Sequence, residues 1–118
     1  METRAGRLEI PAGTGRRSAS IRWVFGQQPA AAHVALVGYE ARYTSSDHHV
    51  RRLTVQLYAS LGGRVDDGWE VLVTGWMDLS DQNSDDPFMG WIDYLLFVEF
   101  SRLTVPPVPL VTVVISPP

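Results

Sequence analysis

The stretch GWEVLVTGWMD, residues 68–78, decides the fold, because apolar and polar residues alternate along it as they do in a β-strand. Successive side chains of a strand point to opposite faces of the sheet. One face carries Trp69, Val71 and Val73, and the other carries Glu70, Leu72, Thr74 and Trp76. Trp76 therefore lies on the more polar face. It is either a recognition platform or an ordinary packed aromatic residue.

Short runs with the same period of two recur along the chain, whereas no segment keeps a 3.6-residue apolar stripe. Six or seven strands at this spacing predict an all-β protein, a small antiparallel β-sandwich. The predicted strands are residues 20–25, 33–39, 52–58, 69–76, 94–100 and 108–115, with a weaker one at 7–10.

The composition limits both size and function. With 118 residues, of which 45% are hydrophobic, the chain fits one domain with a modest core. We expect a sandwich domain at residues 20–118, preceded by a flexible segment at 1–19. The net charge of -3 gives no electrostatic basis for nucleic-acid binding. The absence of cysteine excludes disulfide scaffolds and cysteine zinc sites.

The terminal segments bear on location and assembly. Residues 1–15 have no apolar run typical of a signal peptide, so we expect a cytoplasmic protein or one exported by a non-classical route. Residues 105–115 are apolar but too short and too rich in proline to form a membrane-spanning helix. The strand predicted at 108–115 is apolar on both faces. It either forms a subunit interface or closes the sheet of its own subunit.

Two loops interrupt the strand pattern, a predicted hairpin loop at residues 61–68 and a long polar segment at 78–90. The second loop resembles the start of a calcium-binding loop, since carboxylates cluster in it. The match fails where Asp86 replaces the required glycine and Ile92 replaces the required glutamate. We therefore predict a solvated acidic loop, with a calcium site of another geometry as the alternative. Its oxygen-bearing residues are Asp78, Asp81, Asn83, Asp85 and Asp86.

The sequence supplies little that could carry catalysis, which needs a nucleophile or base with partners in reach, or a metal. His48 and His49 lie in a polar loop and point in different directions, and His33 opens a strand. We expect a non-enzymatic protein without cofactor or metal.

Arg52 and Trp76 are the two outward residues whose chemistry suits a ligand. Apolar residues alternate with polar ones in 52–58, which places Arg52 on the outward side near a strand end. An aromatic face covers the apolar C–H patch of a sugar ring, and a guanidinium donates hydrogen bonds to its hydroxyl groups. The alternative is an arginine packed beside a tryptophan on an ordinary surface.

Several dispersed positions form an ordered pattern. They are Phe25 with Pro29, a valine-containing strand at 34–37, an arginine-led strand at 52–58, Gly68-Trp69, Gly75-Trp76-Met77-Asp78, and a closing strand at 96–100. Over about 80 residues, from 21 to 100, this order resembles the H-type lectins, the family of the snail agglutinins and the discoidin C-terminal domain.

The resemblance implies a six-stranded antiparallel sandwich that forms a homotrimer and binds carbohydrate in clefts between subunits. Arg52 matches the arginine that hydrogen-bonds sugar in the family, and Trp76 matches the tryptophan of its motif. Met77 stands where snail lectins often have a sugar-contacting histidine, so the snail-type preference for N-acetylgalactosamine is not expected. Asp78 completes the motif, and Trp91 is the candidate for a further aromatic contact.

Two functions are therefore compared. The first is a lectin-like carbohydrate-binding module, with Arg52, Trp76, Met77, Asp78 and Trp91 at its site and with several sites acting together in the oligomer. The second is a structural sandwich subunit of a larger assembly, such as a virion or a secretion apparatus. The second is favoured by the two-faced apolar segment near the C-terminus.

Overall fold

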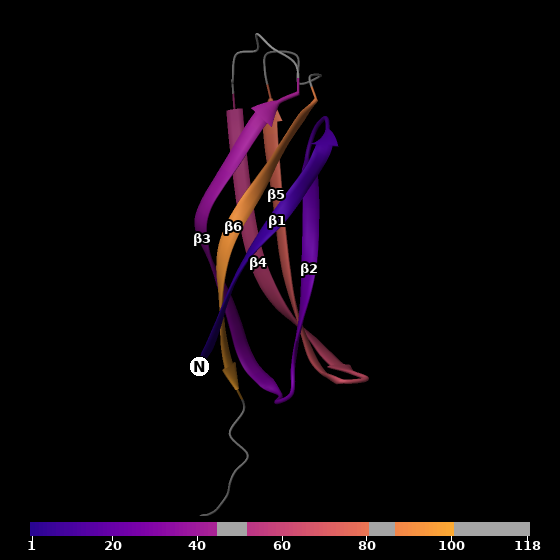
Figure 1. Cartoon of the computed structure of the whole chain (residues 1–118), viewed down its shortest axis with the longest axis vertical. Coiled ribbons are helices and arrows are strands. Elements are labelled where there is room, and N and C mark those ends of the chain that lie inside the picture. Colours follow the sequence, from indigo (N-terminus) through magenta and orange to yellow (C-terminus); the bar gives the residue numbers. More distant parts are fainter. Residues whose placement is uncertain (45–51, 81–86, 101–118) are drawn as a thin grey trace, which may run out of the picture.

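A computed structural model describes residues 1–44, 52–80 and 87–100 of the chain. Its six strands are antiparallel and form two three-stranded sheets, and no helix occurs among the described residues, which confirms the predicted all-β sandwich (Figure 1). In that part of the chain, accordingly, no helix has the length and apolar character needed to cross a membrane. The strands are β1 (Glu2–Gly13), β2 (Arg17–Phe25), β3 (Pro29–Tyr43), β4 (Arg52–Val65), β5 (Gly68–Ser80) and β6 (Phe88–Phe100).

The two sheets have the strand orders β1-β6-β3 and β2-β5-β4. The central strands β6 and β5 are paired on both sides along most of their length. Consecutive strands β1 and β2, and likewise β3 and β4, belong to different sheets, so each connection crosses from one layer to the other. Figure 1 shows the strands running along the long axis of the molecule.

Strict alternation in β5 and β6 builds the core between the sheets. In β5 every second residue from Val71 to Leu79 is buried, and in β6 every second residue from Phe88 to Val98 is buried. Burying each large apolar side chain contributes roughly 1.5–3 kcal/mol, so these two strands supply most of the stabilisation from apolar burial. The fully buried large side chains are Ile10, Val71, Val73, Met77, Phe88, Ile92, Tyr94, Leu96 and Val98.

A hydrogen bond between two aromatic side chains joins the two sheets. Trp23 of β2 donates from Nε1 to the hydroxyl oxygen of Tyr94 of β6, at 2.8 Å. Burial raises the pKa of the Tyr94 hydroxyl above its ordinary value, and the bond from Trp23 acts in the opposite direction. The ring of Tyr94 lies over Gly6 of β1, where a side chain would collide with it.

The strands are longer than the sequence pattern predicts. The hairpin predicted at residues 61–68 is present, but its loop is shorter than predicted. Strand β4 continues to Val65, which pairs with Gly68, so only Asp66 and Asp67 form the turn. Gly62 and Gly63 lie at a bulge, where the pairing shifts between Leu61 and Gly63. Gly63 has a φ of 93°, a conformation that favours glycine. Figure 1 shows this end of the β4–β5 hairpin projecting at the lower right.

The other boundaries follow the same trend. The weak strand predicted at residues 7–10 is the middle of β1, which pairs with β6 from Glu2 to Gly13, so most of the N-terminal segment belongs to the sandwich. The strand predicted at 108–115 lies outside the described residues.

Candidate functional site

Trp76 lies on the outer face of the sheet β2-β5-β4, as the alternation predicts. It is half-buried, and across the sheet it is opposite Ser18 of β2 and Gln56 of β4, whose side chains are exposed. The next row toward the β4–β5 turn contains Ser20, Thr74 and Tyr58, and the hydroxyl groups of Ser20 and Thr74 are 3.0 Å apart. Toward the β4–β5 turn and across the sheet, therefore, the neighbours of Trp76 carry neutral hydroxyl and amide groups.

The arginine in contact with Trp76 is Arg16. Its guanidinium carbon lies 4.1 Å from the centre of the indole ring, in a cation–π arrangement. Arg16 belongs to the short connection between β1 and β2, and it is exposed. The next residue, Arg17, pairs with Met77, so the register of β2 against β5 brings Arg16 to the tryptophan.

Arg52 lies on the same outer face but away from the ring. It is opposite Ser80, four residues beyond Trp76, which corresponds to about 13 Å of strand. Asp78 lies between them on that face, half-buried and opposite Thr54 of β4. The structure thus places Arg52, Asp78 and Trp76 on one face of the sheet, in three successive rows, without direct contact between Arg52 and Trp76.

Met77 and Trp91 do not lie on this face. Met77 points to the other side of β5 and is completely buried in the core, because residues 76 and 77 face opposite ways in a strand. Trp91 lies in β6 and faces outward from the other sheet. Within one chain, therefore, Trp76 and Trp91 lie on opposite outer faces of the sandwich.

Trp91 belongs to a polar cluster of its own. Its Nε1 donates to a carboxylate oxygen of Glu40 on β3 at 2.8 Å, and the guanidinium of Arg7 on β1 lies 3.9 Å from the ring centre. Arg7 also donates two hydrogen bonds to Asp93, from Nε to Oδ1 at 2.6 Å and from Nη2 to Oδ2 at 3.0 Å. This cluster joins all three strands of its sheet, and its contacts are those of a structural network.

The Arg7–Asp93 pair predicts a specific acid response. The hydrogen bonds from Arg7 lower the pKa of the Asp93 carboxyl below its ordinary value, an effect larger than the opposing effect of burial. We expect NMR titration of the full chain to find this lowered pKa, and Arg7→Leu to raise it. A carboxyl with a lowered folded-state pKa stabilises the fold above the ordinary pKa, and this contribution is lost as the pH falls through the folded-state value.

Arg4→Leu is the matched control, because Arg4 lies on the same strand and pairs with Glu2 at 2.7 Å instead. It should leave the Asp93 midpoint unchanged. An Asp93 midpoint that is equal in the wild type and in Arg7→Leu would contradict the assigned cause.

In the described part of the chain, no group of three or more His, Asp or Glu side chains is placed to hold a metal ion. Asp81, Asp85 and Asp86 of the acidic loop, and also His48 and His49, lie outside the described residues. His33 is exposed on β3, opposite Phe97 of β6.

The sequence reasoning missed Arg16 because it lies in a connection, where alternation assigns no face. A signal was nevertheless present. A residue just before a strand lies at the end of the sheet. Arg16, just before the strand predicted at 20–25, is therefore within reach of outward side chains on whichever strand pairs with that strand.

Comparisons with models of known protein families, with curated proteins and with solved structures find no significant match to this chain. The likeness to H-type lectins therefore rests on the residue pattern alone.

Proposed function

We propose that the protein is a non-enzymatic carbohydrate-binding module whose site is the outer face of β2-β5-β4 around Trp76. The observation that carries the proposal is the setting of this tryptophan, between Ser18 and Gln56 and beside the hydroxyl groups of Ser20 and Thr74. An indole covers the apolar face of a sugar ring, and neutral hydroxyl and amide groups exchange hydrogen bonds with the sugar hydroxyls.

Arg16 gives this face a cationic donor. An exposed cation–π contact is worth about 0.5–1 kcal/mol, so a sugar can displace the guanidinium from the ring at small cost. Once displaced, the guanidinium remains next to the ligand and can donate to a hydroxyl pair. Arg16 thus takes the part that the sequence assigned to Arg52, while Arg52 and Asp78 extend the site toward the other end of the strand.

Assembly into a homotrimer is part of the proposal through the family resemblance. One open face binds a single sugar weakly, and several sites on one particle raise the overall strength of binding to a glycan surface. Trp91, on the opposite outer face, then contributes to a site only if it comes from a neighbouring subunit.

A structural role in a larger assembly is the second candidate, and the surface of β3 favours it. Leu36, Val37 and Tyr39, next to the bulge between Leu36 and Gly38, are 49%, 67% and 46% exposed. β3 is an edge strand, and apolar side chains on an unpaired edge are typical of protein contacts.

Glycan-array binding of the full chain tests the first candidate. We expect Trp76→Ala to reduce the signal about two- to twelvefold, because an aromatic stacking contact contributes about 0.5–1.5 kcal/mol. Arg16→Ala should cause a smaller loss. A chain that binds no glycan above background would contradict the lectin proposal and favour the structural role.

Trp91→Ala is the companion variant, with thermal melting as the check on folding. Unchanged binding places the site on one subunit's β2-β5-β4 face. A loss equal to that of Trp76→Ala places both tryptophans in one site, which requires a second subunit.

A further inference from the structure

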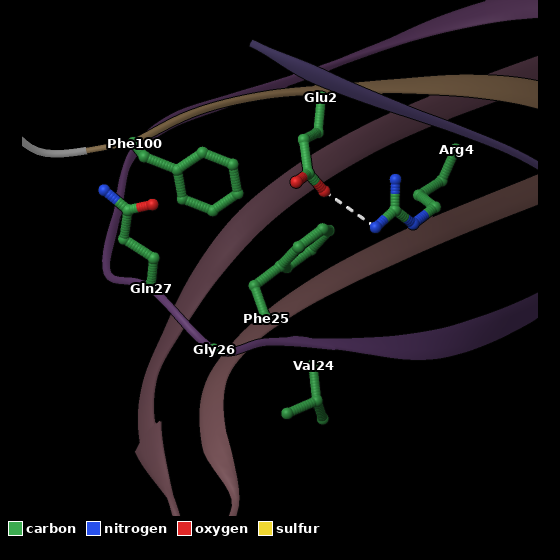
Figure 2. Close-up of a pocket in the computed structure, with 7 residues that line it drawn as sticks. All are labelled: Glu2, Arg4, Val24, Phe25, Gly26, Gln27 and Phe100. Carbon is green, nitrogen blue, oxygen red and sulfur yellow. Dashed lines mark hydrogen bonds and ion pairs between the residues drawn. The ribbon is translucent and has the colours of Figure 1, made fainter.

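A pocket of about 320 Å³ lies at the end of the sandwich where β6 ends. Its walls come from the start of β1, the end of β2, the β2–β3 turn and the last residue of β6 (Figure 2). It is far from Trp76, which lies seven residues along β5 from the partner of Phe25. The pocket is therefore separate from the proposed sugar site.

Two phenylalanines form the apolar part of the pocket. The rings of Phe25 and Phe100 meet edge to face with their centres 5.6 Å apart, and Val24 also lines the pocket. Phe25 is 4% exposed, so its position is set by the core. Figure 2 shows the two rings next to each other, between the end of β6 and the end of β2.

Polar groups form the rest of the wall. The guanidinium of Arg4 lies 5.3 Å from the centre of the Phe25 ring and is held by Glu2 at 2.7 Å. A guanidinium has five N–H groups, and Arg4 uses one on Glu2 and one on the carbonyl of Thr3. An occupant with apolar rings and carbonyl acceptors matches this wall.

We propose that the pocket binds the proline-rich segment of this same chain, residues 105–110, Val-Pro-Pro-Val-Pro-Leu. Prolines hold a chain in the extended polyproline II form, and such segments bind in aromatic-lined grooves because little entropy is lost on binding. Proline has no N–H, so the segment presents mainly rings and carbonyl oxygens to the two phenylalanines and Arg4.

The place where the described chain ends favours this occupant. Phe100 is both a wall of the pocket and the last described residue, and only five residues separate it from Pro106. Six residues of chain reach at most about 21 Å, so Pro106 is tethered near Phe100 and has an effective concentration in the millimolar range. At micromolar protein concentration, binding within one chain therefore prevails over binding to a second copy.

Disulfide trapping in the full chain tests the proposal, because the wild type has no cysteine. Gly26 lies in the pocket wall, and a side chain added there meets no atom within 4 Å, so Gly26→Cys is compatible with the fold. We expect Gly26→Cys combined with Val108→Cys to form an intramolecular disulfide in oxidised glutathione, seen as a faster-migrating monomer on non-reducing gels.

Gly38→Cys with Val108→Cys is the matched control, since position 38 also has open space but lies next to Asp93, seven residues from Phe100 on β6. The Gly26 pair should react at least about tenfold faster than the control pair. Equal rates, or a product that is mainly a disulfide-linked dimer, would overturn binding within one chain.

A second set of variants separates recognition of proline from simple nearness. Replacing Pro106, Pro107 and Pro109 with alanine should slow the Gly26 pair toward the rate of the control pair. Replacing Pro117 and Pro118, which lie outside the proposed segment, should leave the rate unchanged. If the triple replacement has no effect, nearness alone explains the reaction and the proposed recognition is wrong.

Discussion

Replacing Gly90 with alanine is expected to lower the free energy of unfolding by about 3 kcal/mol, because the position has no room for a side chain. Gly90 is buried on the inner side of β6 and pairs with Ile10 of β1 and Ala41 of β3. A Cβ atom there would collide with the carbonyl oxygen of Glu40 and lie 3.1 Å from the Cα of Ala41. Both obstacles are backbone atoms of a paired strand, so neither can move aside without breaking the ladder.

Urea denaturation of the full chain measures this effect, and Gly38→Ala is the control. A Cβ at position 38 meets nothing within 4 Å, so that variant should be unchanged or more stable by up to about 1 kcal/mol. If Gly90→Ala unfolds at the same urea concentration as Gly38→Ala, the close approach of β3 to β6 is not as described.

The strands at the centre of each sheet were the easiest to predict. β5 and β6 are covered on one side by the other sheet, so their alternation is strong, and residues 69–76 and 94–100 lie inside the observed strands. β3 shows the limit. Its bulge between Leu36 and Gly38 changes which residues face inward, and Tyr39 pairs with buried Ile92 yet remains 46% exposed at the sheet edge.

The ends of the strands could not be read from alternation, because pairing continues where burial stops. In β4 most residues after Ala59 are exposed, yet each of them up to Val65, except the bulged Gly62, still has a partner on β5. Exposed strand residues carry no apolar pattern. Gly62 and Gly63 therefore look like a loop in the sequence, although they belong to a bulged strand.

The candidate site was predicted in part. Alternation in β5 places Trp76 outward and, by the same rule, Met77 inward, because neighbouring residues cannot share a face. Placing both in one site came from the family resemblance, and the geometry of a single subunit does not bring them together. The distance from Arg52 to Trp76 depends on the register between β4 and β5, which local sequence does not determine.

Met77→His is the most direct test of that difference, since it introduces the histidine that the resemblance to snail-type lectins would place at this position. We expect the variant to lose about 3 kcal/mol of stability, because Met77 is 0% exposed and lies among buried apolar residues of both sheets. An imidazole there loses the apolar contacts of methionine and has its two nitrogens removed from water. The same burial keeps it from any ligand on the outer face, so glycan binding should not increase.

The pH dependence of stability identifies the cause. Burial disfavours the charged imidazole and lowers its pKa in the folded protein, so the unfolded chain binds more protons and the variant loses further stability as the pH falls below about 6.5. Met77→Leu, which keeps the apolar volume, should cost less than about 1.5 kcal/mol and show no such step. A Met77→His variant as stable as wild type at pH 5 would mean that residue 77 reaches solvent, and the histidine position of the lectin pattern would then belong to the site after all.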